Sequence, residues 1–135
     1  MRLTDNTILI TGGSEGIGLE LARALVPDNT VIICGRSEAK LAETKASLPE
    51  VATMRCDVTD AEQREALVAE ILHRYPKFNL LINNAGGRQV TDLNVGQEVE
   101  TALNADLDLN FSAPVALCQG FLEHLQAQPT AAIVN

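Results

Sequence analysis

Thr11-Gly12-Gly13-Ser14-Glu15-Gly16-Ile17-Gly18 is the stretch that decides the fold, because it joins the apolar run Ile8-Leu9-Ile10 to a segment with helical periodicity. Its glycines can turn the backbone sharply, admit a ligand close to the main chain, and let a helix pack against a strand. The free amides at the start of that helix, together with the helix dipole, favour an anion. We therefore expect a strand, a phosphate-binding loop and a helix in succession.

The spacing of these glycines limits the kind of phosphate loop. Counted from Gly12 to Gly18 it is G-x-x-x-G-x-G, which differs from the G-x-G-x-x-G of most dinucleotide folds. It also differs from the nucleotide triphosphatase loop G-x-x-x-x-G-K-[ST], because no Lys follows Gly18. A plain strand-to-helix turn is the alternative, and four glycines in seven residues disfavour it.

Length and composition narrow the class of protein. The 135 residues predict one domain with a small core, and no segment approaches the ~20 apolar residues that span a bilayer. The net charge of −8 repels nucleic acid and anionic membranes, so we expect neither as a partner. An odd number of cysteines in apolar surroundings indicates buried thiols in a reducing cytoplasm rather than disulfides or a metal site; they are Cys34, Cys56 and Cys118.

Strand-like and helix-like segments alternate along the chain. The strand-like runs are apolar, as expected for strands buried on both faces; they lie at Thr7 to Thr11, Thr30 to Gly35, Val51 to Cys56, Leu80 to Asn83 and Ala131 to Asn135. Helical patterns lie between them; they begin at Ile17, at Ser37 and at Asp60, and the last runs from Val95 to Gln128 with a break near Asn110 to Pro114. This order predicts an α/β protein with a doubly wound, Rossmann-like parallel sheet that stops after about the fifth strand.

The helical segments carry local signals of their own. Ser37 and Asp60 are expected as N-caps, each accepting a hydrogen bond from the amide three positions on. Gln63 at that position permits a weak capping box with Asp60. The first helix repeats apolar residues one turn apart, which is typical of an amphipathic helix; they are Ile17, Leu21 and Leu25.

Small or polar residues follow each of the first four strands. They are Gly12-Gly13, Gly35-Arg36, Asp57-Val58 and Asn84-Ala85-Gly86. Ligands of doubly wound sheets bind at the carboxyl ends of the strands. We therefore expect these four strand ends to form one ligand crevice.

The combination of motifs resembles the short-chain dehydrogenase/reductase family of nicotinamide-dependent oxidoreductases. The matching stretches are TGGSEGIG after the first strand, CDVTD after the third, NNAG after the fourth, and Asn110 within DLNFSAP. The resemblance implies a pyrophosphate loop, an adenine site, a ribose-lining motif and a helix-bending Asn whose carbonyl holds a water in the proton relay. The corresponding residues are Gly12, Ser14, Gly16, Ile17 and Gly18; Asp57 and Val58; Asn84, Ala85 and Gly86; and Asn110.

The end of the second strand favours one of the two nicotinamide cofactors. A carboxylate there would accept hydrogen bonds from the ribose 2′-OH, but this chain has Gly35 and Arg36, and a guanidinium favours a 2′-phosphate. Glu15 opposes this, because family members that prefer the phosphate often carry a basic residue at that position. We expect NADP(H) rather than NAD(H). The alternatives are that Arg36 is a solvated surface residue and that Asp57 is a turn residue.

The catalytic residues that the resemblance implies are absent. The family uses a Ser just after the fifth strand, and a Tyr with a Lys three or four positions on. Here the sole tyrosine, Tyr75, is followed by Pro76 and Lys77. His73 and His124 lie at exposed-looking helical positions with no ligand spacing, so we expect no metal site. We expect residues 1–135 to be a single dinucleotide-binding domain, incomplete at its carboxyl end and inactive alone.

Three functions remain open. The favoured one is the cofactor-binding portion of an NADP(H)-dependent oxidoreductase that transfers hydride between the nicotinamide and a carbonyl or alcohol. The alternatives are a non-catalytic dinucleotide-binding sensor and an interaction module. The resemblance implies a substrate pocket built largely from the segment after the catalytic Tyr, so only residues 87–94 of this chain could contribute to it. The resemblance also implies a homo-oligomer through the 95–128 helices, with apolar contacts from Leu103, Leu107, Leu117, Phe121 and Leu125, unless these pack on the sheet instead.

Overall fold

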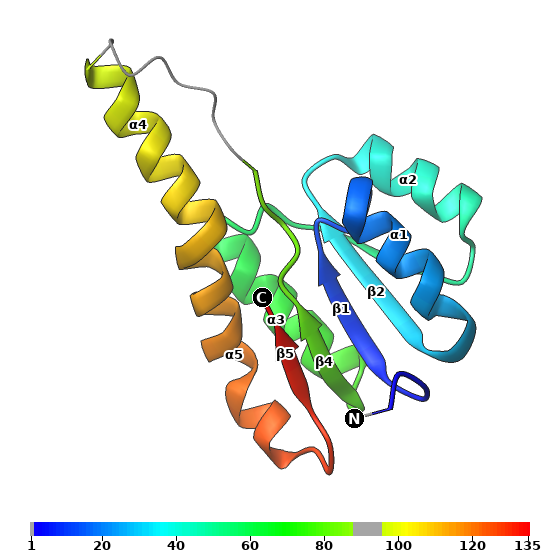
Figure 1. Cartoon of the computed structure of the whole chain (residues 1–135). Helices are drawn as coiled ribbons and strands as arrows, with labels where there is room; N and C mark the ends of the chain where they lie inside the picture. Colours follow the sequence, from blue (N-terminus) through cyan, green and yellow to red (C-terminus); the bar gives the residue numbers. More distant parts are fainter. Residues whose placement is uncertain (1, 88–95) are drawn as a thin grey trace.

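The chain forms one five-stranded parallel sheet with helices on both faces (Figure 1). The computed structural model describes residues 2–87 and 96–135. The strands, in the spatial order β3-β2-β1-β4-β5, are β1 (Thr7–Thr11), β2 (Thr30–Gly35), β3 (Ala52–Arg55), β4 (Phe78–Ile82) and β5 (Ala132–Val134). The crossing from β3 back to β4 reverses the direction of strand addition beside β1, and this is the point where doubly wound folds bind ligands. The predicted fold class is confirmed.

The helices connect successive strands. They are α1 (Gly16–Leu25) with a short η1 turn (Val26–Asp28), α2 (Glu38–Ser47), α3 (Ala61–Arg74), α4 (Gly96–Leu107), a π-helical turn η2 (Asp108–Ser112), and α5 (Ala113–Ala127). None of the helices within the described ranges is long and apolar enough to cross a membrane. The predicted start of the last helical region at Val95, and the loop 88–94, lie outside the described residues.

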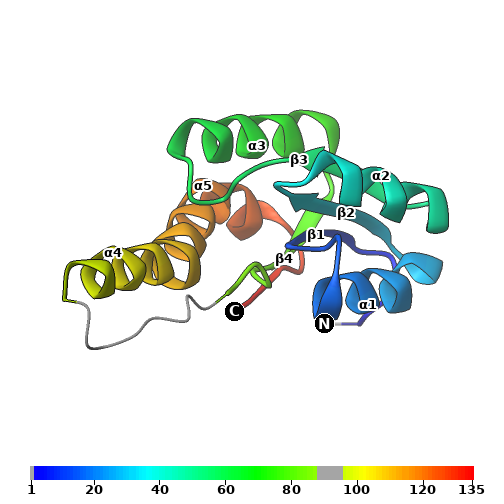
Figure 2. The ribbon, with the colours of Figure 1, turned by 90° about the horizontal axis from the view of Figure 1, so that it is seen from above.

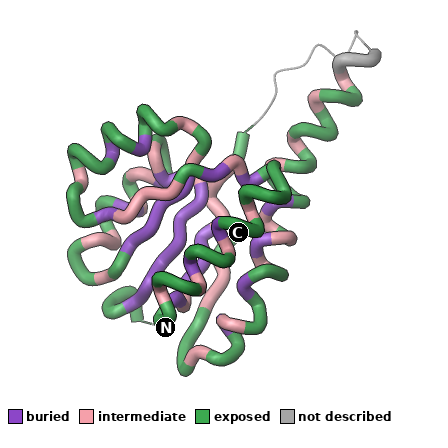
Figure 3. The backbone as a smooth tube through the Cα atoms, turned by 180° about the vertical axis from the view of Figure 1, so that it is seen from behind, coloured by how far each residue is buried: buried purple, intermediate pink, exposed green. Residues whose placement is uncertain are grey.

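Two apolar clusters hold the helices against the sheet. On one face, Ile8, Ile10 and Ile33 pack beneath α1 and α2, which contribute Ala22 and Leu41. On the other face, the alternate strand residues pack against α3 and α5; this cluster includes Leu9, Ile32, Leu81, Leu67, Ile71, Leu117, Phe121 and Leu125. Figure 2 shows the two pairs of helices on opposite sides of the strands, and Figure 3 shows the buried strands between exposed helical surfaces.

The structure shows which of the apolar helix residues are buried, a point that the sequence left open. Ile17 does not belong to a buried face of α1, because 76% of it is exposed and Ala22 makes the contact with the sheet instead. Leu117, Phe121 and Leu125 are not free to build an oligomer interface, because they are buried against the sheet. A helix that crosses a sheet must use one apolar stripe for the core, and α5 uses this one.

The long carboxyl-terminal helical region is one continuous rod rather than two separate helices (Figure 1). The predicted break near Asn110 to Pro114 is present as the π-helical turn η2, which joins α4 to α5. Pro114 follows this turn directly and has no N–H to donate to the preceding turn of the continuous rod. The turn therefore bends and widens the helix without ending it.

At the amino-terminal ends of the strands, the pairing of β1 with β4 contains a bulge that the sequence did not predict. The register between β1 and β4 shifts by one residue after the Thr7–Phe78 pair, so Asn79 is the extra residue of a bulge. Its side chain accepts from the Thr7 amide at 2.9 Å and donates to Asn6 Oδ1 at 3.0 Å. The fourth strand therefore begins at Phe78, not at Leu80 as predicted.

Both predicted N-caps are confirmed, while one predicted histidine environment was wrong. Ser37 Oγ accepts from the Lys40 amide at 3.3 Å, and Asp60 Oδ1 accepts from the Gln63 amide at 3.0 Å. His124 is half-buried rather than exposed, since its ring stacks on Phe78 and its Nε2 lies 3.0 Å from the Phe78 carbonyl oxygen. Because α5 packs on the sheet, His124 faces the start of β4 and is partly shielded from solvent. The sequence alone does not reveal this packing.

Candidate cofactor site

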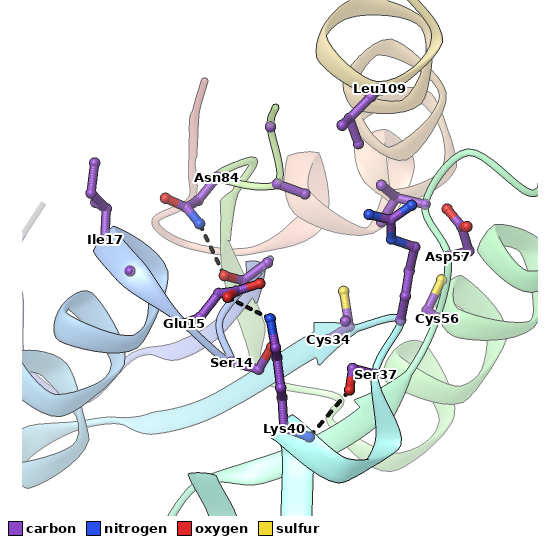
Figure 4. A pocket seen from close by; sticks show the side chains of 17 residues that line it. Ser14, Glu15, Ile17, Cys34, Ser37, Lys40, Cys56, Asp57, Asn84 and Leu109 are labelled. Carbon is purple, nitrogen blue, oxygen red and sulfur yellow. Dashed lines mark hydrogen bonds and ion pairs between the residues drawn. The ribbon is translucent and has the colours of Figure 1, made fainter. Parts of the chain in front are cut away.

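A cavity of about 440 Å³ lies at the carboxyl ends of the strands, where the glycine loop, the start of α2 and the segments after β3 and β4 meet (Figure 4). It brings together most of the residues that the sequence singled out. They are Gly12, Ser14, Gly16, Ile17, Arg36, Asp57, Val58, Asn84, Ala85 and Gly86. Segments separated by more than seventy positions along the chain thus line one space, as the strand-end argument predicts.

The glycine loop opens onto this cavity at Gly16. Gly12 and Gly16 have φ of +66° and +55°, backbone conformations that residues with a side chain rarely adopt. A Cβ added at Gly16 would meet nothing within 4 Å, so the main chain there borders open space. Glu15 is the N-cap of α1, yet its side chain makes no capping hydrogen bond, and the first turn of α1 contains no acidic residue. The amino end of α1 is thus suited to an anion.

Gly18 has a different role from the other predicted loop residues. It does not line the cavity. A Cβ at this position would overlap the Gly12 carbonyl oxygen and lie 2.5 Å from Asn84 Nδ2. Gly18 therefore lets the first turn of α1 lie directly against the loop and the segment after β4.

Hydrogen bonds from the segment after β4 fix the end of β1. The Thr11 hydroxyl accepts from the amides of Asn84 and Ala85, at 3.1 and 2.9 Å. The Asn84 side chain donates to the carbonyl oxygens of Thr11 and Gly12, at 3.0 and 3.2 Å. These contacts, with Thr11 buried, join the loop to the NNAG segment.

Charged groups gather at the carboxyl end of β2. Arg36 and Ser37 follow the strand, and Lys40 lies in the first turn of α2; all three line the cavity. Lys40 Nζ lies 2.6 Å from Glu15 Oε2, an ion pair that joins α2 to the glycine loop (Figure 4). Glu15 therefore lines the cavity with a cation already as its partner.

Asp57 both lines the cavity and forms a turn, so the two alternatives drawn from the sequence are compatible. Its Oδ1 accepts from the amide and the hydroxyl of Thr59, at 3.0 and 2.8 Å. Val58 beside it is buried, and its carbonyl oxygen accepts from Arg64 Nη1 at 2.6 Å. The wall after β3 is therefore shaped by its own hydrogen bonds.

Two buried thiols form part of the floor of the cavity. Burial raises the pKa of Cys34 far above its ordinary value, and the neighbouring Cys56 adds to this. Burial, with a contribution from the charge of Asp57, raises the pKa of Cys56 to about 11. Both groups are therefore neutral thiols at physiological pH and offer a polarizable, uncharged surface rather than a nucleophile. Within residues 2–87 and 96–135, no cluster of His, Cys, Asp or Glu could hold a metal ion.

Asn110 lies outside the cavity wall but next to it. In the π-helical turn, its side chain donates to the carbonyl oxygens of Gly87 and Asp106, both at 2.9 Å. Its Oδ1 lies 3.3 Å from the Gly87 amide, which donates to it. Leu109, its neighbour, does line the cavity. Asn110 thus attaches the bent helix to the segment that follows NNAG.

Some cavity residues were not among the predicted site residues. Lys40, Ser37, Cys34, Cys56 and Leu109 all line the cavity. The sequence does carry a local signal for the position of Ser37 and Lys40. The N-cap at Ser37 sets the start of the helix just after the second strand and so places Lys40, three positions on, near the end of that strand. The thiols and Leu109 had no such signal, because their place depends on how neighbouring strands and the bent helix pack.

Comparison with known proteins agrees with this geometry. The family model described as short chain dehydrogenase matches residues 6–135. The chain belongs to the short-chain dehydrogenase family. Its oxidoreductase relatives include the uncharacterized oxidoreductase DltE of Bacillus subtilis strain 168, which is 53% identical over 136 residues.

Solved structures of the family share the fold. A short-chain dehydrogenase from Streptomyces avermitilis superposes with a TM-score of 0.87 at 30% identity, over 98% of this chain and 49% of that one. The F189W actinorhodin polyketide ketoreductase with NADPH gives 0.87 at 29% identity, over 99% of this chain and 53% of that one. The match to DltE covers 100% of this chain and 54% of that protein. This short-chain dehydrogenase chain therefore spans about half the length of the relatives it matches.

Proposed function

We propose that this chain is the cofactor-binding part of an NADP(H)-dependent oxidoreductase that transfers hydride between the nicotinamide and a carbonyl or alcohol substrate. The observation that carries the proposal is the convergence of four strand ends on one cavity beneath the glycine loop. When bound, the cofactor would supply the hydride. The chain's own residues would bind and orient it.

The residues present fit a dinucleotide. Open space at Gly16 and the uncapped start of α1 suit a pyrophosphate, which would approach the main chain there. Asp57 and Val58 border the space for an adenine ring, with the neutral thiols of Cys34 and Cys56 beside it. Asn84, Ala85 and Gly86 would line the nicotinamide-side ribose. This assignment of roles to the predicted site residues follows the family resemblance and the shape of the cavity.

Several features favour NADP(H) over NAD(H). β2 ends in Gly35 and Arg36, so no carboxylate occupies the position that would accept the ribose 2′-OH. Arg36 lines the cavity and could form a bidentate contact with a 2′-phosphate. The actinorhodin ketoreductase, a structural neighbour of this chain, was solved with NADPH.

We infer that these 135 residues bind the cofactor without turning it over. The single tyrosine, Tyr75, ends α3 just before β4, half-buried with the Arg74 guanidinium 5.6 Å from its ring centre. This is the amino-terminal end of β4, away from the cavity. Tyr75 is therefore a packed helix-end aromatic, and the complete activity would require residues beyond this single dinucleotide-binding domain.

Homo-oligomerisation is a further part of the proposal. The rod formed by α4, η2 and α5 exposes an apolar stripe at four-residue spacing, which consists of Leu103, Leu107, Phe111 and Val115. Exposed apolar stripes of this kind mark interaction surfaces, and a second copy of the chain would cover it. Leu103 and Leu107 belong to the predicted interface, while Phe111 and Val115 replace the buried residues of that prediction.

We also propose that the protein works in the cytoplasm. Its three cysteines are free, and two of them are buried side by side along the cavity floor. Free thiols persist in reducing compartments.

Thermal unfolding with added nucleotides tests the cofactor proposal. NADPH well above micromolar concentration should raise the melting temperature of the chain, because a ligand that binds only the folded state stabilises it by mass action. NADH should raise it less at the same concentration. If NADPH produces no shift, the binding proposal is wrong, and the interaction-module alternative gains support.

A further inference from the structure

Lys40 is placed where a 2′-phosphate of the proposed cofactor would lie. If the glycine loop holds the pyrophosphate, the adjoining ribose falls at the carboxyl end of β2. Ser37, the N-cap of α2, and Lys40, in the first turn of that helix, line the cavity at this point together with Arg36. Lys40 thus provides a second cation within the same small region as the Arg36 guanidinium.

The structure holds Lys40 in a defined position. Its backbone amide donates to Ser37 Oγ at 3.3 Å, which fixes the first turn of α2. The hydroxyl of Thr44, a buried residue, lies 2.9 Å from the Lys40 carbonyl oxygen and 3.3 Å from the carbonyl oxygen of Ser14. Thr44 therefore sets the distance between the turn that carries Lys40 and the glycine loop.

An internal carboxylate already contacts the Lys40 ammonium. Glu15 Oε2 lies 2.6 Å from Lys40 Nζ, and Figure 4 shows the two side chains meeting between the loop and α2. Both side chains are about half exposed or more, at 47% for Lys40 and 67% for Glu15. An ion pair so well hydrated contributes little to stability and is readily exchanged.

We propose that Lys40 is the second cation of a 2′-phosphate subsite, and that Glu15 occupies the place of the phosphate at its ammonium group until the cofactor binds. This inference rests on the proposed function. A phosphate monoester carries up to two negative charges and three acceptor oxygens, so it competes well with one carboxylate for the ammonium. Glu15 then swings away into solvent, which the exposure of its side chain permits.

The test compares two ligands that differ only in the phosphate, 2′,5′-ADP and 5′-AMP, by calorimetric titration of this chain. K40M should weaken 2′,5′-ADP binding about tenfold, as expected for one charge-assisted contact, and leave 5′-AMP binding unchanged. K40R should retain most of the affinity. K77M is the matched control, because Lys77 is an exposed residue just before β4, at the opposite end of the strands.

Glu15 provides the second arm of the test. E15Q should strengthen 2′,5′-ADP binding several-fold, because the phosphate no longer competes with an internal anion. In the E15Q background, K40M should cost at least as much affinity for 2′,5′-ADP as in the wild type. If that cost disappears, Lys40 serves only to neutralise Glu15, and the proposed direct contact is wrong.

The outcomes separate this inference from the proposed function. A wild-type chain that binds neither nucleotide would overturn both. A wild-type chain that binds 5′-AMP with no preference for 2′,5′-ADP would overturn the NADP(H) assignment and, with it, the subsite. Preference for 2′,5′-ADP that K40M does not alter would overturn the role of Lys40 alone.

Discussion

Asn84 forms hydrogen bonds with Thr11 through both its main chain and its side chain. The Asn84 amide donates to the Thr11 hydroxyl at 3.1 Å, and Asn84 Nδ2 donates to the Thr11 carbonyl oxygen at 3.0 Å. Thr11 is the last residue of β1 and Asn84 follows β4. The pair therefore ties the two central strands together immediately below the glycine loop.

Thr11→Val should destabilise the fold, because the amides of Asn84 and Ala85 lose their acceptor in a buried setting. We expect a loss of about 1–3 kcal/mol in the free energy of unfolding, measured by urea denaturation. Thr11→Ser keeps the hydroxyl and is the control. Equal stabilities of the two variants would show that the hydroxyl does not organise this junction.

Arg36→Gln should change cofactor preference rather than stability. Removal of the guanidinium deletes a charge-assisted contact with the 2′-phosphate, worth about 1.5–3 kcal/mol. NADPH affinity should fall at least tenfold while NADH affinity stays the same, as measured by titration of nucleotide fluorescence. Arg23→Gln, on α1 and paired with Glu20, is the control. A parallel loss for both nucleotides would argue for a general electrostatic effect instead.

The buried thiol of Cys56 predicts a loss of stability at alkaline pH. Its pKa is raised from 9.0 to about 11 in the folded protein, mainly by burial, so the folded state keeps its proton above pH 9 while the unfolded state loses it. The stabilisation is complete below pH 9 and declines as pH rises through about 11. Thermal melts at pH 8 and at pH 10.5 should show this decline.

A serine variant isolates the contribution of Cys56 to the pH dependence. Cys56→Ser removes the titrating group, so its melting temperature should fall less between these two pH values than that of the wild type. Cys34 retains its own raised pKa in that variant, and part of the decline should persist. An unchanged decline would mean that Cys56 is not the group responsible.

The exposed stripe on the rod predicts self-association. Phe111, which is 66% exposed, lies in its middle, and Phe111→Glu should place a charge in the interface and shift the oligomer toward monomer. Sedimentation velocity over a range of concentrations measures this shift. Leu3→Glu is the control, because Leu3 is exposed to a similar degree near the amino terminus. A wild-type chain that stays monomeric at high concentration would contradict the prediction.

Those parts of the site that depend on local sequence were predictable. The loop from Gly12 to Gly18 follows a buried strand directly, and Ser37 and Asp60 cap helices through the amide three residues on. In these cases, the residues that determine the structural feature lie within a few positions of it along the chain. A parallel sheet then places every strand end on one edge, which is why Asn84 meets the loop although it lies far along the chain.

Features that depend on packing between distant segments were not predictable. The sequence pattern does not indicate that Asn79 forms a bulge, because the bulge exists only against Thr7 of β1. The sequence indicates Glu15 only as an obstacle to a phosphate, since its pairing with Lys40 requires the loop and α2 to be side by side. The sequence likewise leaves open whether Ile17 and Leu117 are exposed or buried, because helical periodicity reveals an apolar stripe but not the element that this stripe faces.

The rod carries two apolar stripes that are offset by two positions. The inner stripe, Ala113, Leu117, Phe121 and Leu125, is buried, and the outer one, Leu103, Leu107, Phe111 and Val115, is exposed. Two positions along a helix correspond to roughly opposite sides of it. Substitutions on the outer side could therefore create, alter or abolish an interface between copies of the chain, while the inner side keeps the sheet covered. Quaternary structure can then diverge among relatives without destabilising the fold of each subunit.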